Sequence, residues 1–468
     1  MNRTKIIATL GPSCTNPETL QRMVLKGVNA FRVNLSHGSQ EDKKALFDLI
    51  KTLDVSQGER PSILADLAGP KIRVTGLDEA LELKQDEIIY ISSAPTDKRA
   101  IPVSNSIKFQ KVEEGAKILI NDGRVILQVI NDVSDSLLEC KTIIPGIVED
   151  RKGVNFPGIA LDVPTLTDQD EKDLKIALEG GADWVALSFV RSPSDYDIVR
   201  SQIRDLGYNT PIIAKVEKWE AVNNIDGIIN AFDAVMVARG DLGVELPIER
   251  VPLIQKDVIE KASMNGKPVI IATQILDSMI KRPVPTRAEV SDIANAILDG
   301  ADALMVTGET AIGSHPGKVV SVLRNVILET ESAIDYNEFY PIKRHGKINT
   351  AKAISHAACT VAIDQDIKVL VTMTHSGSTA RMVARYRPHS QIIAMTPSKD
   401  ICRQLAIVWG VYSFVVPRYE KTDDFPKLVN EVLKEAKLLN VDEQFVITGG
   451  VPVGVPGTTN YLSVLKLV

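Results

Sequence analysis

A strand-like stretch, PIIAKVE at residues 211–217, places a lysine and a glutamate at the end of an apolar run. Successive side chains of a strand point to opposite faces, so Lys215 and Glu217 share one face with Ile213. A proline is tolerated at the first position of a strand, and the apolar run that follows it favours a short buried strand. A cation beside a carboxylate at this position fits a site that binds an anion together with a metal ion. A buried ion pair that only packs is the alternative that this stretch leaves open.

Polar residues also follow most of the other strand-like runs in the chain. These runs lie at residues 5–10, 31–35, 63–67, 184–190, 211–217, 234–239, 268–273 and 303–306, and helical patterns separate most of them. Eight strands that alternate with helices predict a (β/α)₈ barrel, a TIM barrel, whose active site lies at the carboxyl ends of the strands. The polar residues expected at that face are Arg32, Asn34, Ser36, Asp66, Lys215, Glu217, Arg239, Asp241, Thr273, Thr307 and Glu309. Any one of them could be a satisfied core polar group, but their recurrence favours a site.

These residues suit a particular chemistry. Glu217 and Asp241 are carboxylates, the ligands that a hard divalent ion such as Mg²⁺ prefers. Gly240 can offer a backbone N–H to a substrate carboxylate, and Thr273 supplies a hydroxyl. The cations that would neutralise charge on a phosphoryl group are Lys215, Arg32 and Arg73. The set predicts Mg²⁺-dependent phosphoryl transfer, enolate chemistry on a small carboxylate, or both.

The barrel pattern is interrupted at residues 71–162. Short β runs replace it, and the NDG sequence at 121–123 predicts a hairpin turn. We expect a small all-β domain over the barrel mouth, with the barrel formed by residues 1–70 and 163–340. Its position after the third strand, at the catalytic face, favours a closing lid over a decorative insertion.

Residues 341–468 predict a separate open α/β domain with a mainly parallel sheet. Its first strand-to-helix turn carries the sequence THSGST at 374–379. Free N–H groups at the start of a helix attract anions, although Ser, Thr and Gly also cap helices for no other reason. A second glycine-rich loop begins at Gly449, and together the loops predict a pocket for an effector phosphate. The residues expected to form it are Thr374, Ser376, Gly377, Ser378 and Thr379.

Composition narrows the class of protein. The chain has 54 Lys and Arg against 60 Asp and Glu, a net charge of −6, which argues against a nucleic-acid partner. No apolar run reaches the ~18 residues that span a bilayer, and no signal peptide is evident, so no membrane partner is expected. The four cysteines are far apart, which is typical of thiols in a reducing cytosol and predicts a cytoplasmic protein. Zinc-site and Walker A motifs are absent from the sequence.

The chain resembles the pyruvate kinase family in motifs that span the predicted barrel and its insertion. They are TKIIATLGP (4–12), FRVNLSHG (31–38), KGVNFPG (152–158), IAKVE (213–217), MVARGDLG (236–243), ATQ (272–274), RPVPTRAE (282–289), AILDGAD (296–302) and GETA (308–311), and THSGST extends the match into the last domain. The resemblance implies transfer of the phosphoryl group of phosphoenolpyruvate to ADP, giving pyruvate and ATP in the final step of glycolysis. It also implies a homotetramer and a phosphorylated allosteric effector.

The resemblance assigns roles to the residues already singled out. Lys215 would stabilise the transferring phosphoryl group, and Glu217 and Asp241 would hold Mg²⁺. The residues that would bind substrate are Arg32, Lys215, Gly240, Asp241 and Thr273, with Thr273 also near the path that protonates the enolate. The residues that would contact the nucleotide phosphates or a second Mg²⁺ are Asn34, Ser36, His37, Arg73 and Lys152.

One departure from the family pattern concerns the monovalent cation. Family members that require K⁺ hold it at the positions of Asn34, Ser36, Asp66 and Leu67, and their sequence there is DTKGPE. This chain has DLAGPK at residues 66–71, so Lys71 replaces a glutamate. The resemblance therefore implies that the Lys71 ammonium occupies the K⁺ position and that activity is independent of K⁺. The alternative is that Lys71 points into solvent.

Two other functions remain open. A Mg²⁺-dependent barrel lyase or aldolase acting through an enolate would use Lys215, Glu217 and Asp241 but would leave Arg73, Lys152 and the insertion without a role. A non-catalytic phosphometabolite sensor would be expected to have lost a charged site residue, and none of the matched positions has been lost.

Overall fold

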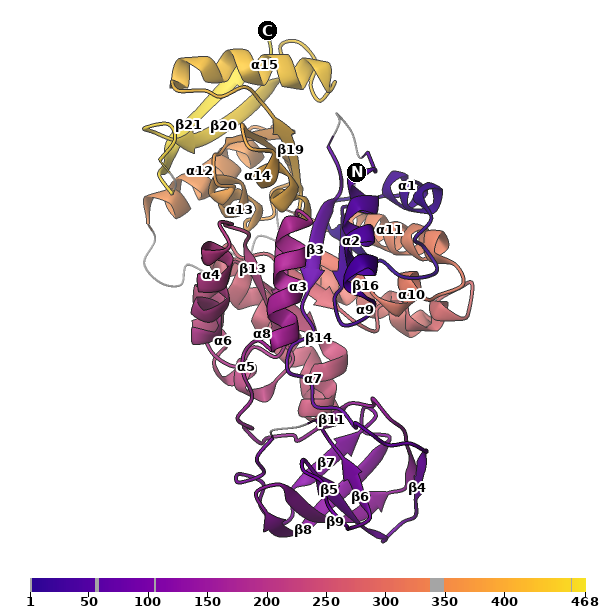
Figure 1. The fold of residues 1–468 in the computed structure, drawn as a ribbon. Helices are drawn as coiled ribbons and strands as arrows, with labels where there is room; N and C mark the ends of the chain where they lie inside the picture. Colours follow the sequence, from indigo (N-terminus) through magenta and orange to yellow (C-terminus); the bar gives the residue numbers. More distant parts are fainter. Residues whose placement is uncertain (1, 55–58, 105–106, 337–348, 456) are drawn as a thin grey trace.

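The computed structural model describes residues 2–54, 59–104, 107–336, 349–455 and 457–468. The chain forms a central barrel with a β-rich domain at one end and an α/β domain at the other (Figure 1). Eight strands close the barrel in the order β1-β16-β15-β14-β13-β12-β3-β2, and every neighbouring pair is parallel. The strands are β1 (Lys5–Thr9), β2 (Ala30–Asn34), β3 (Ser62–Asp66), β12 (Trp184–Leu187), β13 (Ile212–Val216), β14 (Ala234–Ala238), β15 (Val269–Ala272) and β16 (Ala303–Val306). The predicted barrel is confirmed.

Alternation along the barrel strands separates two cores. Phe31 and Val33 of β2 pack outward against the helices, whereas Ala30 and, on β13, Ile213 belong to the barrel interior. The outer helices are α1 (Pro17–Leu25), α2 (Gln40–Lys51), α3 (Asp168–Glu179), α4 (Ser194–Asp205), α6 (Ile225–Ala231), α8 (Val251–Met264), α9 (Arg287–Asp299) and α11 (Pro316–Ser332). Three short helices follow strand ends or their loops: α5 (Trp219–Asn223), α7 (Arg239–Glu245) and α10 (Gly308–Ala311). Since alternation places Lys215 on the face of Ile213, its side chain points into the barrel.

The inserted domain has a core of its own around a six-stranded sheet in the order β11-β7-β8-β9-β5-β6. The strands of the domain are β4 (Leu81–Leu83), β5 (Ile88–Ser92), β6 (Ala100–Pro102), β7 (Lys117–Ile120), β8 (Val125–Ser134), β9 (Leu137–Ile144), β10 (Gly146–Val148) and β11 (Val154–Asn155). Of these, β4 and β10 form a separate two-stranded sheet. The predicted turn joins β7 to β8, and Asn121 and Asp122 there have φ of 55° and 56°. The strands β4, β6, β10 and β11 were not predicted, because two or three residues carry too little alternation.

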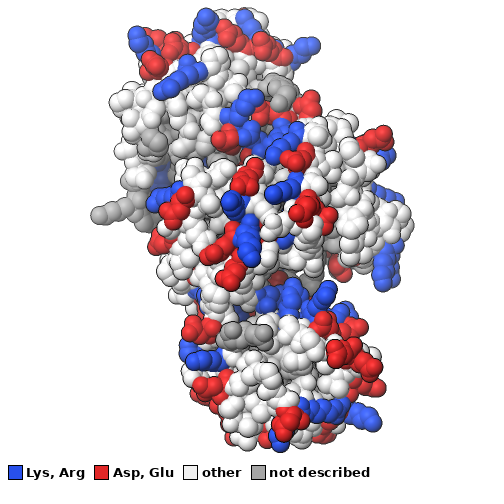
Figure 2. All heavy atoms as spheres, viewed as in Figure 1, with Lys and Arg blue, Asp and Glu red and all other residues white. Residues whose placement is uncertain are grey.

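Two antiparallel segments connect this domain to the barrel: residues 71–74, called the first linker, and residues 151–155, called the second linker. Val74 donates to the Lys152 carbonyl at 2.8 Å, and Val154 donates to the Ile72 carbonyl at 2.9 Å. Lys and Arg side chains gather where the inserted domain meets the barrel, while both signs of charge mix over the rest of the visible face (Figure 2). The linkers therefore enter a basic region.

The last domain is an open α/β fold with sheet order β19-β18-β17-β20-β21. Its elements are α12 (Thr350–Asp364), β17 (Val369–Met373), α13 (Ser378–Ala384), β18 (Gln391–Thr396), α14 (Lys399–Gln404), β19 (Val411–Val415), α15 (Phe425–Glu435), β20 (Gln444–Gly450) and β21 (Thr459–Lys466). Only the edge strand β21 pairs antiparallel in the described sheet, which confirms a mainly parallel arrangement. The sequence did not predict β21.

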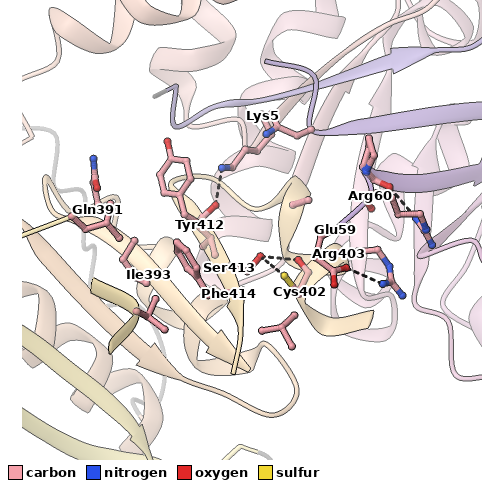
Figure 3. A pocket seen from close by; sticks show the side chains of 18 of the residues that line it. Lys5, Glu59, Arg60, Gln391, Ile393, Cys402, Arg403, Tyr412, Ser413 and Phe414 are labelled. Carbon is pink, nitrogen blue, oxygen red and sulfur yellow. Dashed lines mark hydrogen bonds and ion pairs between the residues drawn. The ribbon is translucent and has the colours of Figure 1, made fainter. Parts of the chain in front are cut away.

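This domain covers the amino-terminal end of the barrel. Ile407 lies among the barrel's interior side chains, and Arg387 forms an ion pair with Asp302 at 3.0 Å. Lys5 donates to the Val411 carbonyl at 2.7 Å beside a cavity of about 500 Å³ (Figure 3). Because that cavity lies opposite the carboxyl ends of the strands, it is not the predicted active site.

Among the described residues, no helix is long and apolar enough to cross a membrane. The four cysteines are buried and form no disulfide in the part of the chain that the structure describes.

Candidate active site

A buried charge cluster centres on Lys215 at the carboxyl end of β13. Its Nζ lies 2.8 Å from Glu217 Oε1 and 3.1 Å from Asp66 Oδ1. Burial by itself lowers the pKa of Lys215, but the carboxylates of Asp66 and Glu217 outweigh burial and hold that pKa above its usual value. Lys215 is therefore a permanent cation at neutral pH, and the ion pair with Glu217 that the sequence left open is present.

A second cation completes the cluster. Arg32 of β2 donates through Nε to Asp66 Oδ2 at 2.7 Å. Burial by itself raises the pKa of Asp66, but the charges of Lys215 and Arg32 outweigh it and lower that pKa. The barrel thus brings together two fixed cations from strands that are far apart in the sequence, as the strand-end pattern predicted.

At Glu217, unlike at Lys215 and Asp66, burial outweighs the effect of the nearby opposite charge on the pKa. Its side chain is 1% exposed, and burial raises its pKa despite the nearby ammonium of Lys215. The carboxylate of Asp241 raises the pKa of Glu217 further, so the two carboxylates are close enough to repel each other. A divalent cation between them would relieve that repulsion, and their oxygens suit a hard ion. The two residues predicted to hold Mg²⁺ therefore fit such an ion.

Asp241 lies in the first turn of α7, which begins directly after β14. Its Oδ1 is 3.0 Å from Nζ of Lys71 on the first linker. Within the described residues, Lys71 makes no ion pair or hydrogen bond with Asn34, Ser36 or Asp66. The lysine is therefore paired rather than extended into solvent, and its partner is a predicted metal ligand.

Thr273 follows β15 and supports the start of α7. Gly240 donates its N–H to Thr273 Oγ1 at 2.8 Å, and that hydroxyl donates to the Ala272 carbonyl at 2.6 Å. Thr273 has φ of 65°, a conformation that costs energy for a β-branched residue and clusters at functional sites. The hydroxyl is thus held at a defined position at the mouth of the barrel.

Comparison with known proteins gives a consistent result over the whole chain. A family profile described as "Pyruvate kinase, barrel domain" matches residues 1–320, and one described as "Pyruvate kinase, alpha/beta domain" matches residues 352–465. The pyruvate kinase of Sporosarcina psychrophila is 41% identical over 477 residues, covering 99% of this chain and 80% of that protein. The pyruvate kinase of Mycobacterium tuberculosis is 40% identical over 468 residues, covering 99% of this chain and 98% of that protein.

A solved structure agrees. The crystal structure of a pyruvate kinase from Cryptosporidium parvum superposes with a TM-score of 0.93 at 33% identity, covering 100% of this chain and 96% of that chain. The chain belongs to the pyruvate kinase family. It is accordingly a phosphotransferase, and the resemblance noted in the motifs is confirmed.

Other predicted residues of the pyruvate kinase site lie around this centre without joining the charge cluster. Asn34 Oδ1 accepts from the Ser36 N–H at 3.2 Å, and both Ser36 and His37 are exposed. Arg73 donates to the Arg151 carbonyl at 3.1 Å, and Lys152 pairs with Glu149 at 3.0 Å. Arg73 and Lys152 therefore lie on the two linkers, at the base of the inserted domain.

Sequence reasoning missed Ser188 and Phe189, which follow β12. Ser188 Oγ accepts from Lys215 Nζ at 2.7 Å, and Phe189 donates its N–H to Glu217 Oε2 at 2.9 Å. The predicted run 184–190 extends three residues beyond β12, which ends at Leu187, so Ser188 was placed inside a strand and not at its end. Arg239 was among the polar residues expected at this face, but it pairs with Asp292 at 2.6 Å and does not join the charge cluster around Lys215.

The two glycine-rich loops of the last domain meet in space. Thr374, Ser376 and Ser378 line a small cavity together with Gly450 and Gly454 of the second loop. The remaining hydroxyl of the first loop, on Thr379, bonds to Thr459 at 2.8 Å, and Gly377 has φ of 75° just before α13. The structure thus brings together the loops from which the sequence predicted an effector site.

Proposed function

We propose that the protein transfers the phosphoryl group of phosphoenolpyruvate to ADP in a Mg²⁺-dependent reaction, giving pyruvate and ATP, the last step of glycolysis. The observation that carries the proposal is the cluster in which the Lys215 ammonium and the Arg32 guanidinium lie against the carboxylates of Asp66 and Glu217. Preorganised cations of this kind stabilise charge on a moving phosphoryl group in a site that excludes water.

Different residues of the site would stabilise the phosphoryl group, hold the metal ion and bind the substrate. Lys215 meets the charge of the phosphoryl group as its bond to the enol oxygen breaks and its bond to the ADP oxygen forms. Glu217 and Asp241 would hold Mg²⁺, which supplies charge neutralisation when bound. The start of α7, at Gly240, would orient the substrate, and the Thr273 hydroxyl would lie near the path by which the enolate is protonated.

The nucleotide would lie between the barrel and the inserted domain. Its phosphates would contact Asn34, Ser36 and His37 from the barrel side and Arg73 and Lys152 from the linkers. A cation on each linker means that closure of the inserted domain would add positive charge around ADP. A second Mg²⁺ would arrive with the nucleotide.

A coupled assay with phosphoenolpyruvate, ADP and MgCl₂ on the purified protein tests this function, with Lys215→Met and Asp241→Asn as variants. We expect pyruvate formation that requires ADP and Mg²⁺ and that both variants reduce at least 100-fold, the range for loss of a preorganised charge. Wild-type protein without ADP-dependent turnover would overturn the proposal. Formation of pyruvate from phosphoenolpyruvate without ADP would instead identify hydrolysis, in which water accepts the phosphoryl group.

We also propose that activity does not require K⁺. The replacement of the family's glutamate by Lys71 supports this, because it brings an ammonium group to the site, although that group pairs with Asp241 at 3.0 Å and not with Asn34, Ser36 or Asp66. Turnover should be equal in tetramethylammonium chloride and in KCl. Strong activation by K⁺ would show that Lys71 does not replace the ion.

Regulation and assembly complete the proposal. The loop at Thr374–Thr379 faces the second glycine-rich loop, which supports a site for a phosphorylated effector. Light scattering on the purified protein tests the proposed homotetramer, and a monomeric mass would exclude it.

A further inference from the structure

Helix α7 is tied at both ends to the linkers of the inserted domain. At its first turn, Asp241 pairs with Lys71 of the first linker at 3.0 Å. At its last residue, Glu245 Oε1 accepts from Asn155 Nδ2 of the second linker at 3.0 Å. A helix of seven residues is about 10 Å long and behaves as one rigid body. A shift of either linker therefore acts on the whole helix.

Glu245 also connects α7 to the segment that directly follows β13, the strand of Lys215. The same Oε1 atom accepts from Nζ of Lys218 at 2.9 Å, and Lys218 directly follows Glu217. The Glu245 side chain is 1% exposed, and Asn155 is buried as well. Because a buried carboxylate needs its partners, this junction has one favoured geometry.

The other oxygen of Glu245 adds a constraint. Oε2 is buried and has no hydrogen-bond partner within the described residues. The carboxylate is therefore held through Oε1 alone, and loss of Asn155 would leave Lys218 as its one remaining partner among the residues described. The amide of Asn155 is thus a sensitive connection between the linker and α7.

We propose that Glu245 is a positioning residue that couples the orientation of the inserted domain, through Asn155, to the substrate-binding start of α7. The inference rests on the proposed function, in which Gly240 and Asp241 at that start bind substrate and metal. Movement of the second linker then changes the position of groups that contact phosphoenolpyruvate. By reciprocity, substrate bound at α7 favours one orientation of the inserted domain.

The test uses Asn155→Ala in the full-length protein, which removes the connection but keeps the ion pair of Glu245 with Lys218. Asn131→Ala is the matched control, because Asn131 is an exposed residue of β8 in the same domain. We expect Asn155→Ala to raise the KM for phosphoenolpyruvate about tenfold with a smaller change in kcat, equivalent to about 1.4 kcal/mol. The control should stay within twofold of wild type.

Hydrogen exchange gives a readout that does not need activity. The Leu246 amide donates to the Leu242 carbonyl at 3.0 Å across the end of α7, so its exchange rate reports the order of this helix. Asn155→Ala should speed exchange at Leu246, and Glu245→Ala, which removes the oxygen that accepts from Asn155 Nδ2, should do the same. The double variant should be no worse than the more affected single variant, since both interrupt one connection.

Each outcome decides the inference. If Asn155→Ala only lowers the unfolding temperature and leaves KM and Leu246 exchange unchanged, the junction is structural and the inference is wrong. If the wild-type protein turns over its substrates, that failure leaves the proposed function intact. If the wild type has no turnover, the proposed function fails, and unchanged Leu246 exchange in Asn155→Ala would separately refute the coupling.

Discussion

Lys5 is a buried lysine at the amino-terminal end of the barrel, far from the active site. Lys5 is 2% exposed. Its Nζ atom donates to the Val411 carbonyl at 2.7 Å and lies 4.3 Å from the centre of the Tyr412 ring. Burial lowers the pKa of Lys5 to about 8, although Glu331 and Asp302 oppose the shift. We predict that this lysine makes stability depend on pH in the alkaline range and that Lys5→Met removes the dependence.

The sign follows from the protons bound in each state. Between pH 8 and 10.5 the unfolded chain keeps the proton of Lys5 while the folded protein releases it, so the free energy of unfolding rises with pH. A fall in pKa from 10.5 to about 8 corresponds to roughly 3 kcal/mol. Below pH 8 both states are protonated, and Lys5 contributes no pH dependence.

Urea unfolding followed by circular dichroism, at pH 7 to 10.5, measures this effect. The difference in unfolding free energy between wild type and Lys5→Met should change by about 3 kcal/mol in favour of wild type across that range. Other titrating groups cancel in the difference, and Lys172→Met, at an exposed lysine, should give a flat difference. A flat difference for Lys5→Met as well would refute the reasoning, because Lys5 would then titrate like an exposed lysine.

Further predictions concern the site, the barrel interior and the last domain. Lys215→Met should lower the free energy of unfolding in urea by about 3–5 kcal/mol at pH 7, because Glu217 loses a buried counter-ion; unchanged stability would mean that the cluster rearranges. Ile407→Ala should cost about 2–5 kcal/mol by leaving a cavity at the bottom of the barrel, with KM unchanged in the coupled assay. A loss below about 0.5 kcal/mol would show that the barrel closes without Ile407. Ser378→Ala should abolish the response of the initial rate to a phosphorylated effector and spare the basal rate, whereas loss of the basal rate would identify a structural loop.

The fold could be predicted because its elements are encoded locally. The sequence pattern predicts a helix over residues 168–179, and α3 spans those residues; Asn16 caps α1 by accepting from the N–H groups of Glu18 and Thr19. Bounds of the barrel strands differ from prediction by at most three residues, and β21 was missed because a glycine-rich loop separates it from its partner β20. Period and capping are properties of neighbouring residues, which a sequence displays directly.

The centre of the site could also be predicted, because parallel strands deliver their carboxyl ends to one face. That rule placed Arg32, Asp66, Lys215 and Glu217 together before any distance was known. It did not predict that Ser188 accepts from Lys215, because the predicted run 184–190 placed Ser188 inside a strand and not at its end.

Amino-acid sequence alone therefore determined which elements form, which face each side chain takes and which strand ends carry charge. Tertiary structure alone decided the partners: Lys71 on Asp241, Asn155 and Lys218 on Glu245, and Ile407 inside a barrel to which it contributes no strand. The physical reason is that periodicity sets direction within one element, whereas a contact of about 3 Å between separate elements depends on how the barrel closes and how the domains dock.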